Sequence, residues 1–184
     1  MIEVPKYSIG TYDPTSPIDN CRTDFTRRIP SLPRKNLERD AKIARQLCNA
    51  QQKSNEALIA TFVKTCRLLS NPRYWETLRS VWVAAGSTET APLFRRLMKS
   101  IRPCRGWFMT VEDANALDAM QFPLTVWRAY DAEPDPGISW TIDREWCEGY
   151  ARSKGRQVKE RQVMREEIFA YVTRRGESEI ILLD

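Results

Sequence analysis

The chain has 184 residues, of which 42% are hydrophobic and 29% are charged, and its formal net charge is +5. This length predicts one domain, or one domain with a modest extension, and the composition is that of a globular protein with a core. Histidine is absent, which excludes Ser-His-Asp and Cys-His catalysis, HExxH metal sites and imidazole acid–base chemistry. Any chemistry must therefore use carboxylates, hydroxyls, thiols, arginine or lysine.

The cysteines and the hydropathy of the sequence indicate the cellular compartment of the protein. The five cysteines form no Cys-x-x-Cys pair and leave one over after pairing, so we expect neither a disulfide framework nor a metal site. No apolar run approaches the ~20 residues of a membrane span, and the first residues, MIEVPKYSIG, lack the basic start and apolar stretch of a signal peptide. These features predict a cytoplasmic protein without a membrane partner.

The first part of the chain combines a proline-rich stretch with a basic segment. Residues 1–33 hold five of the eleven prolines, which disfavour regular helix, so we expect an irregular arm there. Residues 22–45 carry eight basic and three acidic side chains. Such a segment is either the solvated face of a helix or a surface for nucleic acid or an acidic partner.

Residues 34–121 have the pattern of a helical part. From residue 34 to residue 70 there is neither Pro nor Gly, and apolar residues recur at helical spacing. We predict one long helix or two successive ones, with the polar stretch NAQQKSNE as the possible break. Asn71-Pro72 favours the start of another helix, and Gly86 stands where that helix would end. Two shorter helices are expected at residues 91–100 and 110–120.

Residues 122–184 have a different pattern, rich in β-branched and aromatic residues. We predict strands at residues 124–130, 138–142, 157–164 and 178–183. Between them, Asp143 can cap a helix that runs to Arg152, and residues 165–172 are predicted to form another helical turn or two. The fold class is therefore α+β, in which the helical part and the β-rich part form one compact domain.

Four polar residues stand inside or beside these strands. Arg128 follows Val126-Trp127, where a guanidinium is expensive to bury unless an anion meets it; Ser139 lies in Gly137-Ile-Ser-Trp-Thr. Glu177 and Glu179 are two residues apart, so they point to one face of a strand. Taken singly, these residues are also explained by exposed strand positions and by a charged sheet edge.

Their order along the chain resembles one family. An Arg strand, then Gly-Ile-Ser-Trp-Thr, then Arg-Gly-Glu-Ser-Glu-Ile-Ile is similar to the Arg-Ser-Glu class of mono-ADP-ribosyltransferases, particularly the small bacterial and phage-type members. The resemblance covers residues 122–184. It implies a helical N-terminal part followed by a mixed β-sandwich catalytic core, and NAD as co-substrate without a metal. The absence of histidine argues against the related His-Tyr-Glu class.

The resemblance also implies roles for these residues in binding NAD and catalysing the transfer. Arg128 would hold the phosphate side of NAD, and Ser139 would brace the nicotinamide ribose. Glu179 would bond the ribose 2′-hydroxyl and stabilise the oxocarbenium-like ribose, much as glycosidase carboxylates do. Glu177 would receive the acceptor, an arginine of a target protein, which we expect to be a host protein modified in the producing or an infected cell.

Three further positions would contribute to the same NAD site. The hydroxyl of Thr141 would fix the catalytic glutamate, and Tyr150 would pack on nicotinamide. Ala129 replaces the glycine that often follows the Arg in this family, close to the nicotinamide amide. Tyr171 would lie in the loop before the Glu-x-Glu strand that reads the acceptor.

Two other functions compete with the transferase. The first is an NAD glycohydrolase, in which water replaces the acceptor, although the intact Glu177 argues against it. The second is a catalytically silent protein that uses residues 22–45 to bind nucleic acid, which we favour less, or an acidic partner.

Overall fold

The computed structural model describes residues 32–174 and 177–184. The predicted arm, residues 1–33, falls almost entirely outside these ranges, as do the basic residues that precede Pro33. The chain divides into two compact units, one of Met1–Ala85 with Arg102–Val111 and one of Gly86–Ile101 with Glu112–Asp184. We call them the helical unit and the sheet unit. The helix expected at residues 91–100 belongs to the sheet unit, so the division falls inside the predicted helical part.

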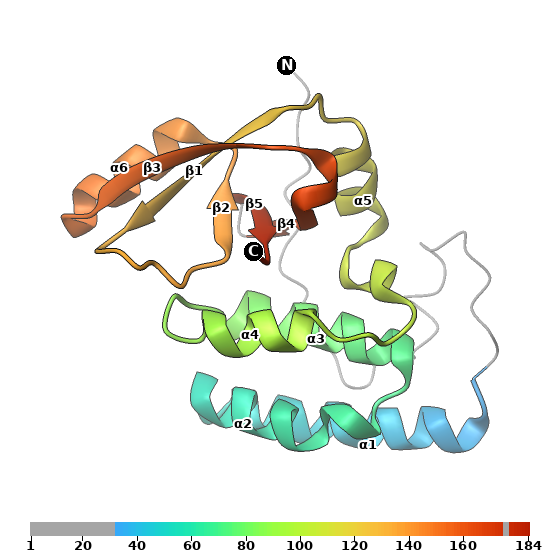
Figure 1. Ribbon diagram of the computed structural model, residues 1–184. Helices are drawn as coiled ribbons and strands as arrows, with labels where there is room; N and C mark the ends of the chain where they lie inside the picture. The colour runs from blue at the N-terminus through green and yellow to red at the C-terminus, as the bar shows by residue number, and fades with distance from the viewer. Residues whose placement is uncertain (1–31, 175–176) are drawn as a thin grey trace. The chain divides into compact units, whose positions relative to one another are not determined.

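The helical unit confirms the expected helices (Figure 1). Its elements are α1 (Arg34–Gln51), α2 (Asn55–Thr65), the short 3-10 helix η1 (Cys66–Leu68), α3 (Asn71–Ala85) and η2 (Arg105–Phe108). The polar stretch does break the first segment into two helices, because Ser54 caps α2 by accepting a hydrogen bond from the Ala57 N–H at 3.1 Å. The core of the unit is made by large apolar side chains, among them Phe62, Trp75, Leu78 and Trp82.

A buried acid ties α1 to the start of α3. The Ser70 N–H donates to Asp40 at 3.1 Å, and the Ser70 hydroxyl donates to the other carboxylate oxygen of Asp40. Beside it, burial raises the pKa of Glu76 although its ion pair with Arg73, at 2.5 Å, acts in the opposite direction. The bonds from Ser70 to Asp40 hold α1 against the start of α3.

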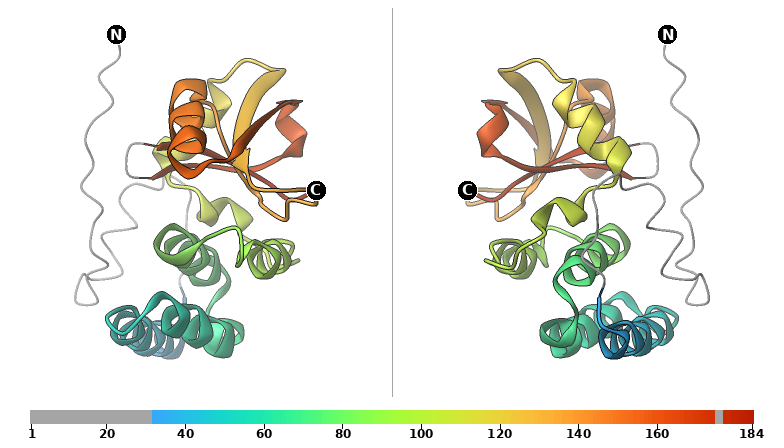
Figure 2. Two further views of the ribbon diagram at one scale, coloured as in Figure 1. Left: turned by 90° about the vertical axis from the view of Figure 1, so that its left-hand side faces the viewer. Right: turned by 90° about the vertical axis from the view of Figure 1, so that its right-hand side faces the viewer.

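The sheet unit contains all five strands described. Its elements are α4 (Ala91–Met98), α5 (Val111–Asp118, from Glu112 on), β1 (Leu124–Tyr130), β2 (Ser139–Thr141), α6 (Arg144–Lys154), β3 (Gln157–Val163), η3 (Arg165–Glu167), β4 (Ile168–Arg174) and β5 (Glu177–Leu182). Figure 2 shows α5 and α6 on the same side of the sheet. Asp143 caps α6 as predicted, accepting from the Trp146 N–H at 2.9 Å, and Gly155 ends that helix with φ of 66°.

The sheet differs from the expected mixed sandwich. Within the described residues the strands form one sheet of order β3-β1-β2-β5-β4, and each neighbouring pair is antiparallel. A parallel pair needs a long crossover, whereas antiparallel strands can follow each other through short connections, as β4 and β5 do. β1 and β2 join at one register pair, Trp127 with Thr141, so the sheet consists of a β1–β3 pair and a β2–β5–β4 group.

The prediction of a helical turn over residues 165–172 is wrong for most of that segment. Only Arg165–Glu167 form a 3-10 turn, and Ile168–Arg174 form β4, which pairs with β5. The β-branched and aromatic residues of Ile-Phe-Ala-Tyr-Val favour a strand, and pairing with β5 buries them on both faces. No helix among the described residues is long and apolar enough to cross a membrane.

Candidate functional site

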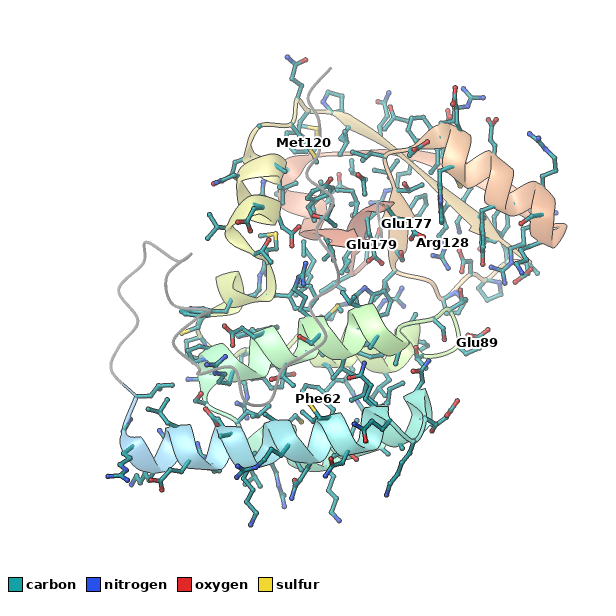
Figure 3. All side chains as sticks on the ribbon, turned by 180° about the vertical axis from the view of Figure 1, so that it is seen from behind. Phe62, Glu89, Met120, Arg128, Glu177 and Glu179 are labelled. Atoms are coloured by element: carbon teal, nitrogen blue, oxygen red, sulfur yellow. The ribbon has the colours of Figure 1, made fainter. Side chains whose placement is uncertain are left out.

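The pairing of β2 with β5 brings the predicted Ser-x-Thr and Glu-x-Glu motifs together. Ser139 is the register partner of Ile181, and Thr141 is the register partner of Glu179. Register partners in an antiparallel pair point to the same face, and side chains alternate along each strand. Ser139, Thr141, Glu177 and Glu179 therefore share one face of the sheet; Figure 3 labels the two glutamates on β5.

Burial differs along this face. Glu179 is 4% exposed, whereas Glu177 and Ser139 are half-buried. The Thr141 hydroxyl oxygen accepts a hydrogen bond from the Asp143 N–H at 3.1 Å, where the chain enters α6. Its own proton remains available to a neighbouring carboxylate, and the predicted bond to Glu179 stays a prediction. The face thus has an inner acid beside a hydroxyl and an outer acid nearer solvent.

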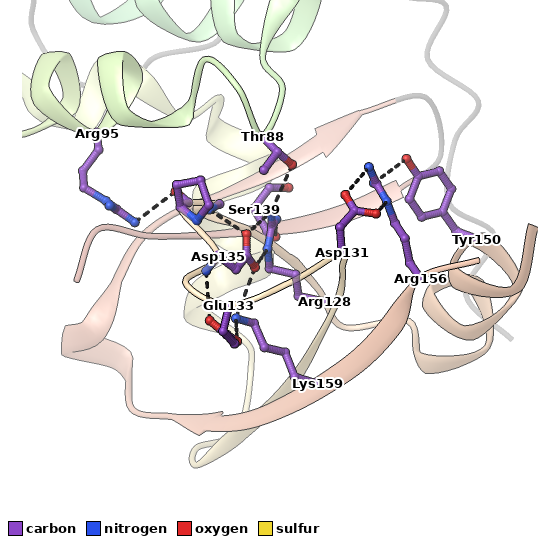
Figure 4. Close-up of polar contacts among 12 residues, drawn as sticks. Thr88, Arg95, Arg128, Asp131, Glu133, Asp135, Ser139, Tyr150, Arg156 and Lys159 are labelled. Carbon is purple, nitrogen blue, oxygen red and sulfur yellow. Dashed lines mark hydrogen bonds and ion pairs between the residues drawn. The ribbon is translucent and has the colours of Figure 1, made fainter. Parts of the chain in front are cut away.

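Arg128, on β1, is 8% exposed and already has an anionic partner (Figure 4). Its Nε donates to Asp135 at 2.6 Å and its Nη2 donates to the other oxygen of that carboxylate at 3.1 Å. Nη1 donates to the Ser139 carbonyl at 2.5 Å and Nη2 to the Thr88 hydroxyl at 3.2 Å. These contacts use four of the five guanidinium N–H groups, so within the described part of the chain one N–H on Nη1 has no partner and can meet a ligand.

Asp135 is the buried partner of two cations. Burial acts to raise its pKa, but hydrogen bonds from Arg128 and the Gly137 N–H, with the charge of Arg128, lower the pKa from 3.8 to about 2. Lys159 adds an ion pair to Asp135 at 3.1 Å, and it also pairs with Glu133 at 2.9 Å. The carboxylate is therefore ionised at neutral pH, and it holds the segment before β2 in place.

Gly137 is required by this arrangement. A Cβ at residue 137 would lie 1.5 Å from Nη2 of Arg128 and 1.9 Å from its Cζ. The Gly137 N–H also donates to Asp135 at 2.9 Å. The guanidinium therefore occupies the space that a side chain at residue 137 would need, which explains why glycine precedes Ile-Ser-Trp-Thr.

The structure separates Arg128 from the acidic face. Trp127 is the register partner of Thr141, so alternation along β1 directs the next side chain, Arg128, to the opposite face of the sheet. On that face, Arg128 is the register partner of Lys159, whose ammonium lies 5.6 Å from the centre of the Trp140 ring. Arg128 reaches Ser139 through the backbone carbonyl and not through the hydroxyl.

The remaining predicted site residues lie elsewhere in the sheet unit. Tyr150 is on α6, where its ring stacks on Trp146 with centres 5.4 Å apart and its hydroxyl accepts from Arg156 at 3.1 Å. Ala129 is paired with β3 in the β1–β3 ladder. Tyr171 lies within β4 and not in a loop as predicted, and its hydroxyl contacts the Ser178 hydroxyl at 3.0 Å.

Sequence reasoning missed the partners of Arg128. Neither Asp135 nor Lys159 belongs to the three motifs that carry the family resemblance, so the sequence pattern did not single them out. One signal was present: a buried arginine needs an anion, and Glu133-Pro-Asp-Pro-Gly137 places two acids directly before β2.

Comparison with known proteins adds no family to this geometry. No protein-family model, no curated protein and no solved structure matches the chain.

Proposed function

We propose that the protein is an NAD-dependent mono-ADP-ribosyltransferase that modifies an arginine of a target protein and releases nicotinamide. The supporting observation is the shared face of β2 and β5, where the Ser139 and Thr141 hydroxyls stand beside the Glu177 and Glu179 carboxylates. Hydroxyls can order a ribose, and a carboxylate can stabilise the positive charge that develops on it.

The chemistry follows from the position of each acid. The bond between C1′ of the ribose and the nicotinamide nitrogen breaks, and nicotinamide leaves as a neutral molecule. Glu179, buried beside Thr141, suits the developing oxocarbenium charge because electrostatic interactions are stronger away from water. The acceptor guanidinium nitrogen bonds to C1′ and gives one proton to Glu177, which is more exposed and so nearer to an incoming protein side chain.

Arg128 lies on the opposite face of the sheet and supports the face that carries Ser139 and Glu179. Its contacts with Asp135, Gly137 and the Ser139 carbonyl set the position of the segment that enters β2. We infer that Arg128 acts mainly as a positioning residue for Ser139, and that its single remaining N–H is the part that can meet a phosphate oxygen. Its predicted role as the phosphate-holding cation stays a prediction.

The experiment compares Glu179→Gln with Glu177→Gln in two reactions, NAD hydrolysis and transfer to agmatine, a small arginine analogue. Glu179→Gln removes the charge that stabilises the ribosyl cation, so both reactions should fall about 100-fold or more. Glu177→Gln should abolish transfer but leave slow hydrolysis largely intact. Glu166→Gln, an exposed glutamate of η3, is the matched control and should change neither reaction.

Three results would count against the proposal. Full activity of Glu179→Gln would remove the transferase. Identical losses of both reactions in both variants would refute the division of labour between the two acids. An NAD glycohydrolase is indicated if the wild-type protein hydrolyses NAD, ignores agmatine and is unaffected by Glu177→Gln.

One observation favours the binding protein as a second candidate. Helix α1 exposes five basic side chains, those of Arg34, Lys35, Arg39, Lys42 and Arg45. The same surface can also serve the transferase by contacting an acidic protein target. In that case, reversing Arg34 and Lys35 to Glu should slow modification of that target more than it slows NAD hydrolysis. Steeply salt-dependent nucleic-acid binding without NAD turnover would instead support the silent binding protein.

A further inference from the structure

Arg95, on α4, has a guanidinium that its surroundings do not satisfy. Its Nη2 donates to the Pro136 carbonyl at 3.3 Å, and its Nε is buried without a hydrogen-bond partner (Figure 4). Among residues 32–174 and 177–184, no carboxylate lies within 4.0 Å of it as an ion-pair partner. A buried polar group without a partner is costly and needs an explanation.

The other cations around the start of β2 are already neutralised. Arg128 pairs with Asp135, and Lys159 pairs with Asp135 and Glu133. Arg156 pairs with an aspartate of the same connection, at 2.9 Å. Arg95 therefore differs from its neighbours because its charge and most of its donors are uncommitted.

Asp184, which follows β5, does not neutralise the charge of Arg95. The charge of Arg95 contributes to lowering the pKa of Asp184, but the direct partner of that carboxylate is Arg161. Arg96 and Lys99, on the same helix as Arg95, are exposed, so water screens their charges. The local balance around Arg95 thus favours an anion.

The location of Arg95 agrees with the order of groups in NAD. Pro136, which Arg95 contacts, precedes Ser139 by three residues, which is about 10 Å of extended chain. In NAD the pyrophosphate directly follows the nicotinamide ribose. A diphosphate bound by Arg95 would then lie near the end of the sheet where β2 begins, next to a ribose held at Ser139.

We propose that Arg95 binds the diphosphate of NAD, and that its uncommitted N–H groups supply most of the charge-assisted contacts, because Arg128 has one N–H left while it pairs with Asp135. This inference rests on the proposed function for the identity of the ligand. The chemistry that it assigns to Arg95 is recognition of a nucleoside diphosphate.

The test measures binding by calorimetry on the full chain, with NAD and ADP as separate probes. Arg95→Gln should weaken both about 10- to 100-fold, because a charge-assisted contact to phosphate is lost. Arg96→Gln, the exposed neighbour with the same charge, is the matched control and should change affinity less than twofold. Thermal unfolding of each variant establishes that it is folded, and Arg95→Lys, expected to lose severalfold, replaces Arg95→Gln if the latter does not fold.

The outcomes separate this inference from the transferase. If the wild-type protein binds NAD and Arg95→Gln binds it equally well, or if Arg96→Gln loses as much, the diphosphate site is overturned and the transferase stands. If ADP binding depends on Arg95 but NAD is not turned over, the site stands and the transferase fails. If the wild-type protein binds neither probe, the diphosphate site is overturned.

Discussion

The carboxylate of Asp135 should make the stability of the protein depend on pH in acid. Its side chain is 3% exposed, and its pKa is lowered from 3.8 to about 2 by Arg128 and the Gly137 N–H against the effect of burial. The lowered pKa corresponds to about 2 kcal/mol of stability at neutral pH. Because the pKa is lower in the folded protein, this stabilisation is present above about pH 4 and is lost as the pH falls through 2.

The perturbation is Asp135→Asn, and the assay is urea unfolding followed by tryptophan fluorescence at several pH values. The free energy of unfolding of the wild-type protein, minus that of the variant, should fall by about 2 kcal/mol between pH 5 and pH 2 and stay level above pH 5. In an Arg128→Met background the same comparison should give a smaller change, because the main partner is gone. A difference that does not change between pH 5 and pH 2 would refute the reasoning.

Two further substitutions test packing and buried polar contacts. Gly137→Ala should destabilise the protein by about 1–3 kcal/mol or more, because its Cβ would lie 1.5 Å from Nη2 of Arg128. Gly149→Ala should stabilise α6 by about 0.5–1 kcal/mol, because a Cβ there meets nothing within 4 Å. Thermal unfolding of both variants checks these values. Asp40→Ala should cost about 1–3 kcal/mol in urea unfolding, because it leaves the buried Ser70 N–H and hydroxyl without their acceptor; a loss below 0.5 kcal/mol would contradict the contact.

The elements that local chemistry specifies could be predicted from the sequence. Asp143 and Gly155 mark the two ends of α6, and Ser54 lies at the break between α1 and α2. β1 begins and ends where its run of β-branched and aromatic residues does. Residues 165–172 could not be assigned in this way, because their strand depends on pairing with β5, which is a non-local contact.

The candidate site could be predicted only in part, for a related reason. Alternation placed Glu177 and Glu179 on one face, and the β2–β5 register then put Thr141 beside Glu179. The partner of Arg128 depends instead on how the connection between β1 and β2 folds back. The periodicity of side chains does not specify that conformation. The sequence therefore indicates an acidic partner for Arg128 but does not identify it as Asp135.

The buried pair of Arg128 and Asp135 compensates for a weak point in the sheet. β1 and β2 share one register pair, so few backbone hydrogen bonds hold the β1–β3 pair to the β2–β5–β4 group. Arg128, rooted in β1, bonds to the Ser139 carbonyl on β2 and to Asp135 in the connection between them. A buried ion pair adds little net stability compared with apolar packing, but its directed hydrogen bonds fix geometry. The geometry fixed here is the position of Ser139 relative to β1, and this is the residue that the proposed transfer requires beside the ribose.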